Sequence, residues 1–181
     1  GVSLDIHREP VVGDPPRGTG HPSDRQFMRP PPEHLVEAAA WVDENASRGA
    51  LSAHARAHLS RALQLQVNNA PFYRVARSRT GDSELQCIFK YLSKVEAEHA
   101  STIKKILKVD PPEPEADEAV ATDSDHENIV LAQQREVEAT AFYAQAATEA
   151  DEERLRKVFR ALSEIESEPI SLEQNLLDKG I

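Results

Sequence analysis

Glycine is absent from one long stretch of the chain, and this absence constrains the fold more than any other feature. The seven glycines stand at positions 1, 13, 18, 20, 49, 81 and 180, so none lies between Asp82 and Lys179. Strand-and-turn architectures need glycine where the backbone turns with positive φ. Ala, Glu, Leu, Lys and Arg abound here instead and favour helices. The stretch therefore predicts an all-α fold with long helices.

Hydrophobic periodicity and helix-ending signals divide this part of the chain into four helices. We expect them at residues 52–79, 83–108, 125–149 and 152–178. Gly81 and Asp82 separate the first two, and Asp82 is a candidate N-cap, as is Asp151 before the last helix. Because both of these links are short, each neighbouring pair of helices is expected to form an antiparallel hairpin.

The connection between the second and third helices, residues 109–124, is longer and rich in proline and acidic residues. Fourteen extended residues reach roughly 46 Å, whereas a 26-residue helix is about 39 Å long. The connection can therefore run the length of the bundle, so that the helix at 125–149 begins at the same end as the one at 83–108. A four-helix bundle with one such crossover is the ferritin-like topology.

The second hairpin repeats the first without gaps at an offset of 70 residues. The repeat includes the Phe-Tyr pair at 72–73 and 142–143 and the Glu-x-Glu pair at 96–98 and 166–168. Two amphipathic helices share some apolar positions by chance, but they do not by chance share aromatic pairs, loop length and acidic pairs in one register. We interpret the bundle as a duplicated helical hairpin with approximate two-fold symmetry.

Two segments precede the bundle. Residues 1–32 are rich in proline and glycine and are expected to form an extended arm. Residues 33–47 follow Pro32, end before Gly49 and carry Trp41, which predicts a short leading helix that packs on the bundle. The expected organisation is thus an arm at 1–32 and a domain at 33–181.

The charge and cysteine content exclude several classes of protein. The net charge of −10 argues against nucleic acid or an anionic membrane as a partner. Most of this charge comes from residues 109–128, which contain eight acidic residues and no Lys or Arg. The single cysteine, Cys87, excludes a disulfide framework and a cysteine-cluster metal site within this sequence. With no long apolar run or leader segment, we expect a cytoplasmic protein without a membrane partner.

Polar residues interrupt the apolar faces of the helices at their middles. Glu96 and His99 lie about 60° apart on one face of their helix, and Glu166 takes the same place in the last helix. Glu136 and Gln66 each stand seven residues before a tyrosine, Tyr143 and Tyr73 respectively. We expect both tyrosines to donate hydrogen bonds to carboxylates. The candidate metal ligands are thus Glu96, His99, Glu136, Glu166 and, through its amide oxygen, Gln66.

These residues also carry a family resemblance. The segment VEAEHA at 95–100, Glu136 with Phe142-Tyr143 downstream, and IESEP at 165–169 resemble the rubrerythrin branch of the ferritin-like superfamily. The resemblance covers roughly residues 55–178. It implies two non-haem irons between the helices, reaction with peroxide or dioxygen, and electrons delivered by a rubredoxin module. If the chain is an enzyme, it would then be a non-haem iron oxidoreductase.

The sequence departs from the family pattern at two ligand positions, where Gln66 replaces a glutamate and Pro169 replaces a histidine. The resemblance implies that Glu96 and Glu166 bridge the metals, which leaves His99 to one metal and Glu136 to the other. We therefore expect a di-iron or single-metal site, with manganese or zinc as alternatives to iron. One cysteine cannot supply rubredoxin's four thiolates, so an electron donor would be a separate protein. We also expect a homo-oligomer, a dimer.

Three alternatives stay open. Buried carboxylates need cations, protons or hydrogen bonds, so a metal-free polar core would make the chain a degenerate ferritin-like scaffold that acts through protein–protein association. An apolar-ligand pocket at the bundle centre is a weaker alternative. Separately, His54 and His58 have the i, i+4 spacing that can clamp a metal, but no acidic motif adjoins them, and the favoured interpretation is two histidines at the surface or the bundle end.

Overall fold

The computed structural model describes residues 51–115 and 120–181, and these form four long α-helices and no strand. The helices are α3 (Ala53–Arg79), α4 (Ser83–Leu107), α5 (Asp125–Glu149) and α6 (Glu153–Asp178). Each bound lies within one residue of its expected position, so the helical prediction is confirmed. The expected arm at 1–32 and leading helix at 33–47 lie outside the described residues.

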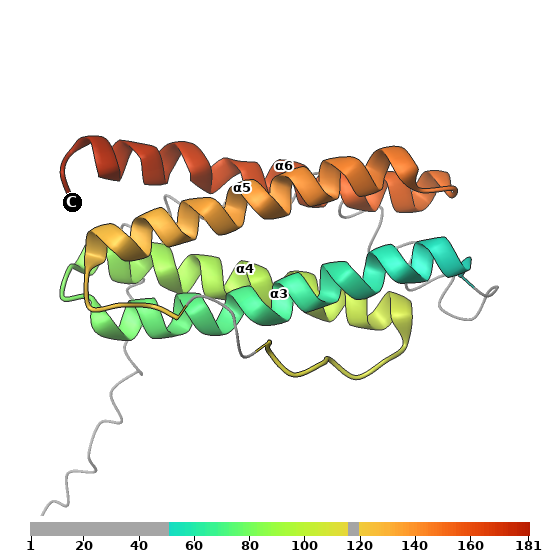
Figure 1. The fold of residues 1–181 in the computed structure, drawn as a ribbon, viewed down its shortest axis with the longest axis horizontal. Coiled ribbons are helices and arrows are strands. Elements are labelled where there is room, and N and C mark those ends of the chain that lie inside the picture. Colours follow the sequence, from blue (N-terminus) through green and yellow to red (C-terminus); the bar gives the residue numbers. More distant parts are fainter. Residues whose placement is uncertain (1–50, 116–119) are drawn as a thin grey trace, which may run out of the picture.

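The helices pack as two antiparallel hairpins, α3 with α4 and α5 with α6 (Figure 1). The start of α5 lies at the same end of the bundle as the start of α4, although these helices are consecutive in the chain (Figure 1). The chain therefore crosses the length of the bundle between them, as the length of the connection allows. The two hairpins also meet directly through α3 and α5, which run in opposite directions.

Side-chain caps explain where the helices begin, and one cap prediction is wrong. The Oδ1 atom of Asp82 accepts hydrogen bonds from the backbone N–H groups of Glu84 (2.8 Å) and Leu85 (2.9 Å), so Asp82 is the N-cap of α4 as predicted. Asp151 is not a cap. Helix α6 begins one residue later, and its N-cap, Glu152, makes no capping hydrogen bond through its side chain.

This difference gives a direct test. Asp82→Ala is expected to lower the free energy of unfolding by about 1 kcal/mol, because two backbone donors lose their acceptor. Asp151→Ala is the matched control and is expected to change stability by less than half of that. Urea unfolding followed by circular dichroism measures both variants. Equal losses in the two variants would contradict the capping assignment.

The core consists of two apolar clusters with a polar layer between them. One cluster lies toward the start of α3, and its largest members are Leu59, Leu63, Ile103, Tyr143, Leu155 and Phe159. The other lies toward the end of α3, and its largest members are Phe72, Tyr73, Ile88, Phe89, Ile129 and Leu176. The polar layer lies at the middles of the four helices, and an apolar cluster packs on each side of it.

Contacts inside the first hairpin recur inside the second at an offset of 70 residues. The rings of Tyr73 and Phe89 stack with their centroids 6.4 Å apart, and those of Tyr143 and Phe159 do so at 6.3 Å. A serine hydroxyl in each second helix donates to a backbone carbonyl in the first: Ser93 to Ala70 (3.3 Å) and Ser163 to Thr140 (3.1 Å). The two hairpins therefore share packing as well as sequence.

Candidate metal centre

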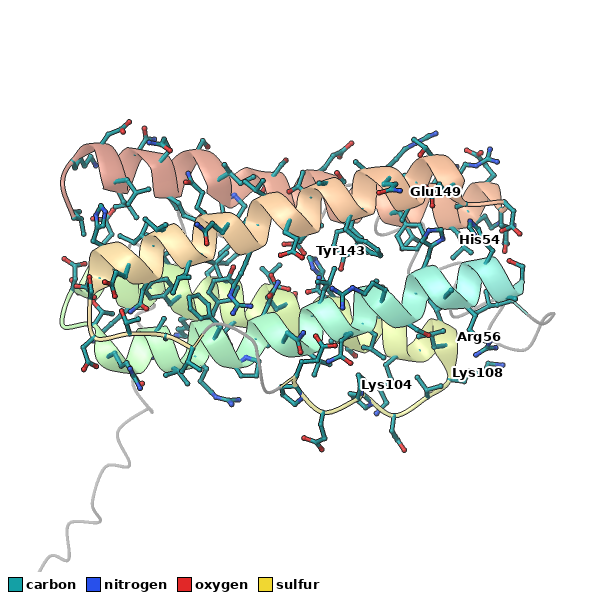
Figure 2. All side chains as sticks on the ribbon, viewed as in Figure 1. His54, Arg56, Lys104, Lys108, Tyr143 and Glu149 are labelled. Atoms are coloured by element: carbon teal, nitrogen blue, oxygen red, sulfur yellow. The ribbon has the colours of Figure 1, made fainter. Side chains whose placement is uncertain are left out.

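The polar layer, which we call the seam, contains all five predicted ligands. Gln66 comes from α3, Glu96 and His99 from α4, Glu136 from α5 and Glu166 from α6, and none of them exceeds 5% exposure. The seam lies between the two hairpins, where Figure 2 shows the neighbouring Tyr143 pointing inward. The structure therefore brings one or two residues from each helix into a single buried layer.

Glu166 interacts with each of the other four predicted ligands in the seam. Its Oε1 atom lies 3.0 Å from Nδ1 of His99 and accepts a hydrogen bond of 3.1 Å from Nε2 of Gln66. When one carboxyl of each pair carries a proton, Glu166 also shares hydrogen bonds with Glu96 and with Glu136. Glu96, His99 and Glu166 each offer one ligand atom, and these three atoms lie within 4.8 Å of one another.

Several acceptor oxygens in the seam have no donor among the described residues. They are both carboxylate oxygens of Glu96, Oε2 of Glu136 and Oε1 of Gln66. A buried polar atom without a hydrogen-bond partner costs about 1–3 kcal/mol. All four of these atoms are acceptors, so they need donors, which means protons or positive charge. A cation or added protons would satisfy them.

Burial controls the protonation of the carboxyls. Burial, followed by the charge of Glu166, raises the pKa of Glu96 well above its ordinary value, and the same two causes raise the pKa of Glu136. Burial alone would also raise the pKa of Glu166, but hydrogen bonds from His99, Glu136 and Gln66 outweigh it and lower that pKa. Without a cation, Glu166 is thus the carboxyl that ionises first, and its neighbours keep their protons to higher pH.

The two tyrosines of the seam differ from each other. The hydroxyl of Tyr73 donates to Oε1 of Glu136 at 2.5 Å, as predicted. The prediction is wrong for Tyr143, whose hydroxyl accepts a hydrogen bond from Nε2 of Gln66. Each tyrosine faces the residue seven positions before the other, and on α3 that residue is an amide. Burial raises the pKa of both tyrosines well above the ordinary value, so both stay protonated.

One buried carboxyl was missed in the sequence. Glu173 on α6 is only 1% exposed, and neither of its oxygens has a donor among the described residues. Burial raises its pKa to about 8. The charge of Glu173 also raises the pKa of Tyr73 and of Glu136, so Glu173 interacts electrostatically with residues of the seam. Glu173 stands seven residues after Glu166, and this spacing could have identified it as an inward-facing residue.

A buried cation was missed as well. Arg135 is 8% exposed, donates from Nη1 to Oδ1 of Asn69 at 2.9 Å, and lies over the ring of Phe72 at 4.4 Å from the centroid. Its charge lowers the pKa of Glu96, although burial and Glu166 together outweigh this effect. An arginine beside a carboxylate core offsets part of the negative charge but cannot donate to all the orphaned oxygens.

Pro169 occupies the place on α6 that corresponds to His99 on α4 at the offset of 70 residues. It is buried, and α6 continues through it from Glu153 to Asp178. Proline has no side-chain nitrogen, so this position supplies no metal ligand. The donor set of the seam is therefore asymmetric, with one imidazole on the α4 side and none on the α6 side.

Comparison of the chain with protein-family models, with curated proteins and with solved structures gives no match. Within the part of the chain that the structure describes, no helix combines the length and the apolar character needed to cross a membrane. The functional proposal therefore depends on the chemistry of the seam.

Proposed function

We propose that this chain is a ferritin-like metal protein of the rubrerythrin type, which holds one or two transition-metal ions in the seam and acts in iron, dioxygen or peroxide handling. The observation that carries the proposal is the set of four buried acceptor oxygens, on Gln66, Glu96 and Glu136, that lack donors beside the His99–Glu166 pair. A divalent cation would satisfy several of these atoms at once, whereas each proton satisfies one.

The donor set fits such an ion. Glu96, His99 and Glu166 would hold the first ion, because their ligand atoms already lie within 4.8 Å of one another. Glu136 and the amide oxygen of Gln66 would serve a second ion, each with an oxygen that no described donor occupies. Imidazole and carboxylate together suit iron, manganese or zinc, and helix bundles build di-iron and di-manganese sites from such residues.

The other side chains position and protect the ligands. A redox-active metal in such a site supplies one-electron chemistry toward dioxygen or peroxide. Tyr73 fixes one oxygen of Glu136 through its hydrogen bond and leaves the other free to ligate. Arg135 lowers the cost of a charged Glu96. The apolar clusters on both sides of the seam keep bulk water away from it.

Two features of the fold support the ferritin-like part of the proposal. The starts of α4 and α5 lie at the same end of the bundle, as one full-length crossover requires. The stacked aromatic pairs and serine–carbonyl contacts recur at an offset of 70 residues, as expected for a duplicated hairpin. A homodimer and a separate electron-donor protein complete the proposal.

One observation favours a second candidate, a metal-free scaffold that acts through protein association. Hydrogen bonds to His99 and Gln66 already stabilise the charge of Glu166, and raised pKa values leave protons on Glu96 and Glu136. Such a seam would be nearly neutral without metal. The two candidates differ in what Glu96 does: it ligates a cation in the first and carries a proton in the second.

Metal content separates these candidates. The full chain is purified after growth with added iron or manganese, and its metal is measured by elemental analysis. The wild-type protein is expected to contain one or two equivalents, and Glu96→Gln is expected to lose most of the metal in the seam, since it replaces a ligand without changing side-chain size. Glu98→Gln is the matched control, because Glu98 is exposed on the same helix and pairs with Lys94.

Equal metal content in wild type, Glu96→Gln and Glu98→Gln would contradict the proposed site. Absence of metal from the wild-type protein under both growth conditions would favour the metal-free scaffold.

A further inference from the structure

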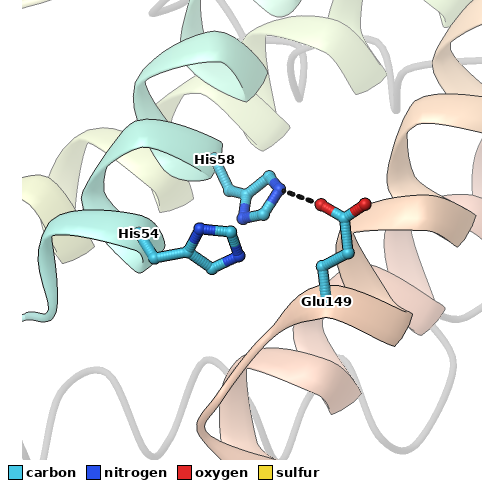
Figure 3. Close-up of side chains that lie close together, drawn as sticks. All are labelled: His54, His58 and Glu149. Carbon is cyan, nitrogen blue, oxygen red and sulfur yellow. Dashed lines mark hydrogen bonds and ion pairs between the residues drawn. The ribbon is translucent and has the colours of Figure 1, made fainter.

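A second cluster of metal-binding side chains lies at one end of the bundle, away from the seam. His54 and His58 stand one turn apart near the start of α3, and Glu149 is the last residue of α5. Because α3 and α5 run in opposite directions, these two helix ends meet. Figure 3 shows the three side chains pointing toward one another across the gap between the hairpins.

The distances suit a metal ion. Nε2 of His58 lies 2.9 Å from Oε2 of Glu149, and the rings of His54 and His58 have centroids 4.5 Å apart. Each of the three residues offers a ligand atom within 4.8 Å of the other two. With bonds of about 2.0–2.2 Å, tetrahedral ligand atoms lie roughly 3.4 Å apart. Small side-chain rotations would therefore close the site, without movement of the helices.

The surrounding residues orient these ligands. The ring of His58 packs against Phe142 and Phe159, with centroids 6.5 Å and 6.2 Å away. Gln145 donates to Oε1 of Glu149 at 2.7 Å, which leaves Oε2 directed at His58. Hydrogen bonds to a ligating carboxylate and packing around a ligating imidazole are the supports that metal sites use.

The buried side of His58 is incompletely satisfied. Its Nδ1 atom is buried and has no hydrogen-bond partner among the described residues, while its Nε2 atom faces Glu149. The side chain is 15% exposed and that of Glu149 is 39% exposed, so ions from solvent can reach the pair. The hydrogen bonds from Gln145 and His58 lower the pKa of Glu149, which keeps it ionised.

The opposite end of the bundle is joined differently. The residue that corresponds to Glu149 at an offset of 70 is Arg79, which donates to the carbonyl of Ala121 at 2.6 Å and pairs with Asp123 at 3.5 Å. These contacts tie the end of α3 to the segment before α5. Among the described residues, the histidine end has the His58–Glu149 pair in the corresponding place. A metal ion there would give this end a comparable connection.

We propose that His54, His58 and Glu149 form a second divalent-metal site, of the zinc class, that joins the start of α3 to the end of α5. Two imidazoles and one carboxylate are a zinc donor set that leaves the fourth position to water. The site is independent of the seam, with which it shares no residue. Its metal stabilises the contact between the hairpins, because an ion that binds only the folded state adds stability.

The test uses Co²⁺ and Zn²⁺ as probes of the full chain in a Glu96→Gln background, so that a seam metal does not contribute. Co²⁺ is expected to bind with one tight equivalent and a visible absorption spectrum, and Zn²⁺ is expected to displace it and to raise the unfolding temperature. Glu149→Gln and His54→Ala are each expected to weaken this binding at least tenfold. Neither change empties the core, and each leaves the packed ring of His58 in place.

His126→Ala is the control, because His126 is an exposed histidine near the other end of the bundle, where its Nδ1 faces the backbone oxygen of Ile181. It is expected to leave the tight equivalent unchanged. Equal affinity in wild type, Glu149→Gln and His54→Ala, or the absence of any tight equivalent, would overturn the proposal. Neither result would affect the seam, which Glu96 variants test separately.

Discussion

Replacing Glu173 with leucine is expected to stabilise the protein by an amount that increases with pH. The difference in free energy of unfolding between the variant and wild type should grow by about 4 kcal/mol between pH 4.5 and pH 8. Burial raises the pKa of Glu173 to about 8 in the folded state, against an ordinary value of 4.5. In this window the unfolded chain loses the proton and the folded chain keeps it. The folded state thus binds more protons, and wild-type stability falls as pH rises. The leucine variant lacks this loss.

Urea unfolding of both proteins across this pH range, in a chelating buffer, measures the difference. Glu98→Leu is the control for replacing a carboxyl with an aliphatic side chain, since the side chain of Glu98 is 65% exposed. The helix position itself accepts an aliphatic residue, because Ile103 occupies the corresponding place on α4 and is fully buried. A pH-independent difference between wild type and Glu173→Leu would show that Glu173 has an ordinary pKa.

The substitution Glu96→Gln is expected to stabilise the protein without metal and to destabilise it, relative to wild type, when metal is added. In chelator at pH 8, the variant should be more stable than wild type by about 1–3 kcal/mol, because it removes a buried carboxyl whose two oxygens have no donor. With Mn²⁺ at a thousand times its dissociation constant, wild type should gain about 4 kcal/mol through binding. The variant lacks the ligand and should gain little from the seam.

The sign change distinguishes a metal centre from a polar core. Chemical unfolding with and without Mn²⁺ gives the four free energies that are needed, and Glu98→Gln should follow wild type in both conditions. Stabilisation from any other metal site appears equally in wild type and variant and cancels in their difference. If Glu96→Gln is more stable than wild type with and without Mn²⁺, Glu96 holds a proton rather than a metal.

The helices were predictable because their signals are local. Periodicity and breakers placed every bound within one residue, and the Asp82 cap follows from a side chain two and three residues before its donors. The prediction that Asp151 caps the last helix was wrong because the N-cap position is one residue later, at Glu152. Capping depends on backbone angles at one position, and the sequence does not distinguish two adjacent acidic residues.

Site residues could be predicted where helix periodicity alone places them in the interior. They could not be predicted where tertiary contacts determine whether a side chain is buried. Glu96, His99 and Glu166 follow the apolar faces of their helices and are buried. Glu173 follows the same rule, seven residues after Glu166, and was detectable. Arg135 was not, because long basic side chains on a helix usually reach solvent.

The bundle-end cluster depends on a contact between distant parts of the chain. The i, i+4 spacing of His54 and His58 is visible in the sequence, but their carboxylate partner, Glu149, lies 91 residues after His58. Only the antiparallel arrangement of α3 and α5 brings it there. Without that contact, two surface histidines are the reasonable interpretation, and with it the same residues become a candidate site.

Anomalous diffraction at the iron edge, from crystals of the full chain grown anaerobically with Fe²⁺, shows directly whether the seam binds a metal ion. We expect a peak in the seam between Glu96, His99 and Glu166, with ligand atoms about 2.0–2.2 Å from the metal. A second peak beside Glu136 and Gln66 would indicate a dinuclear centre. A seam without any anomalous peak, in crystals grown with saturating Fe²⁺, would show that the seam is not a metal centre.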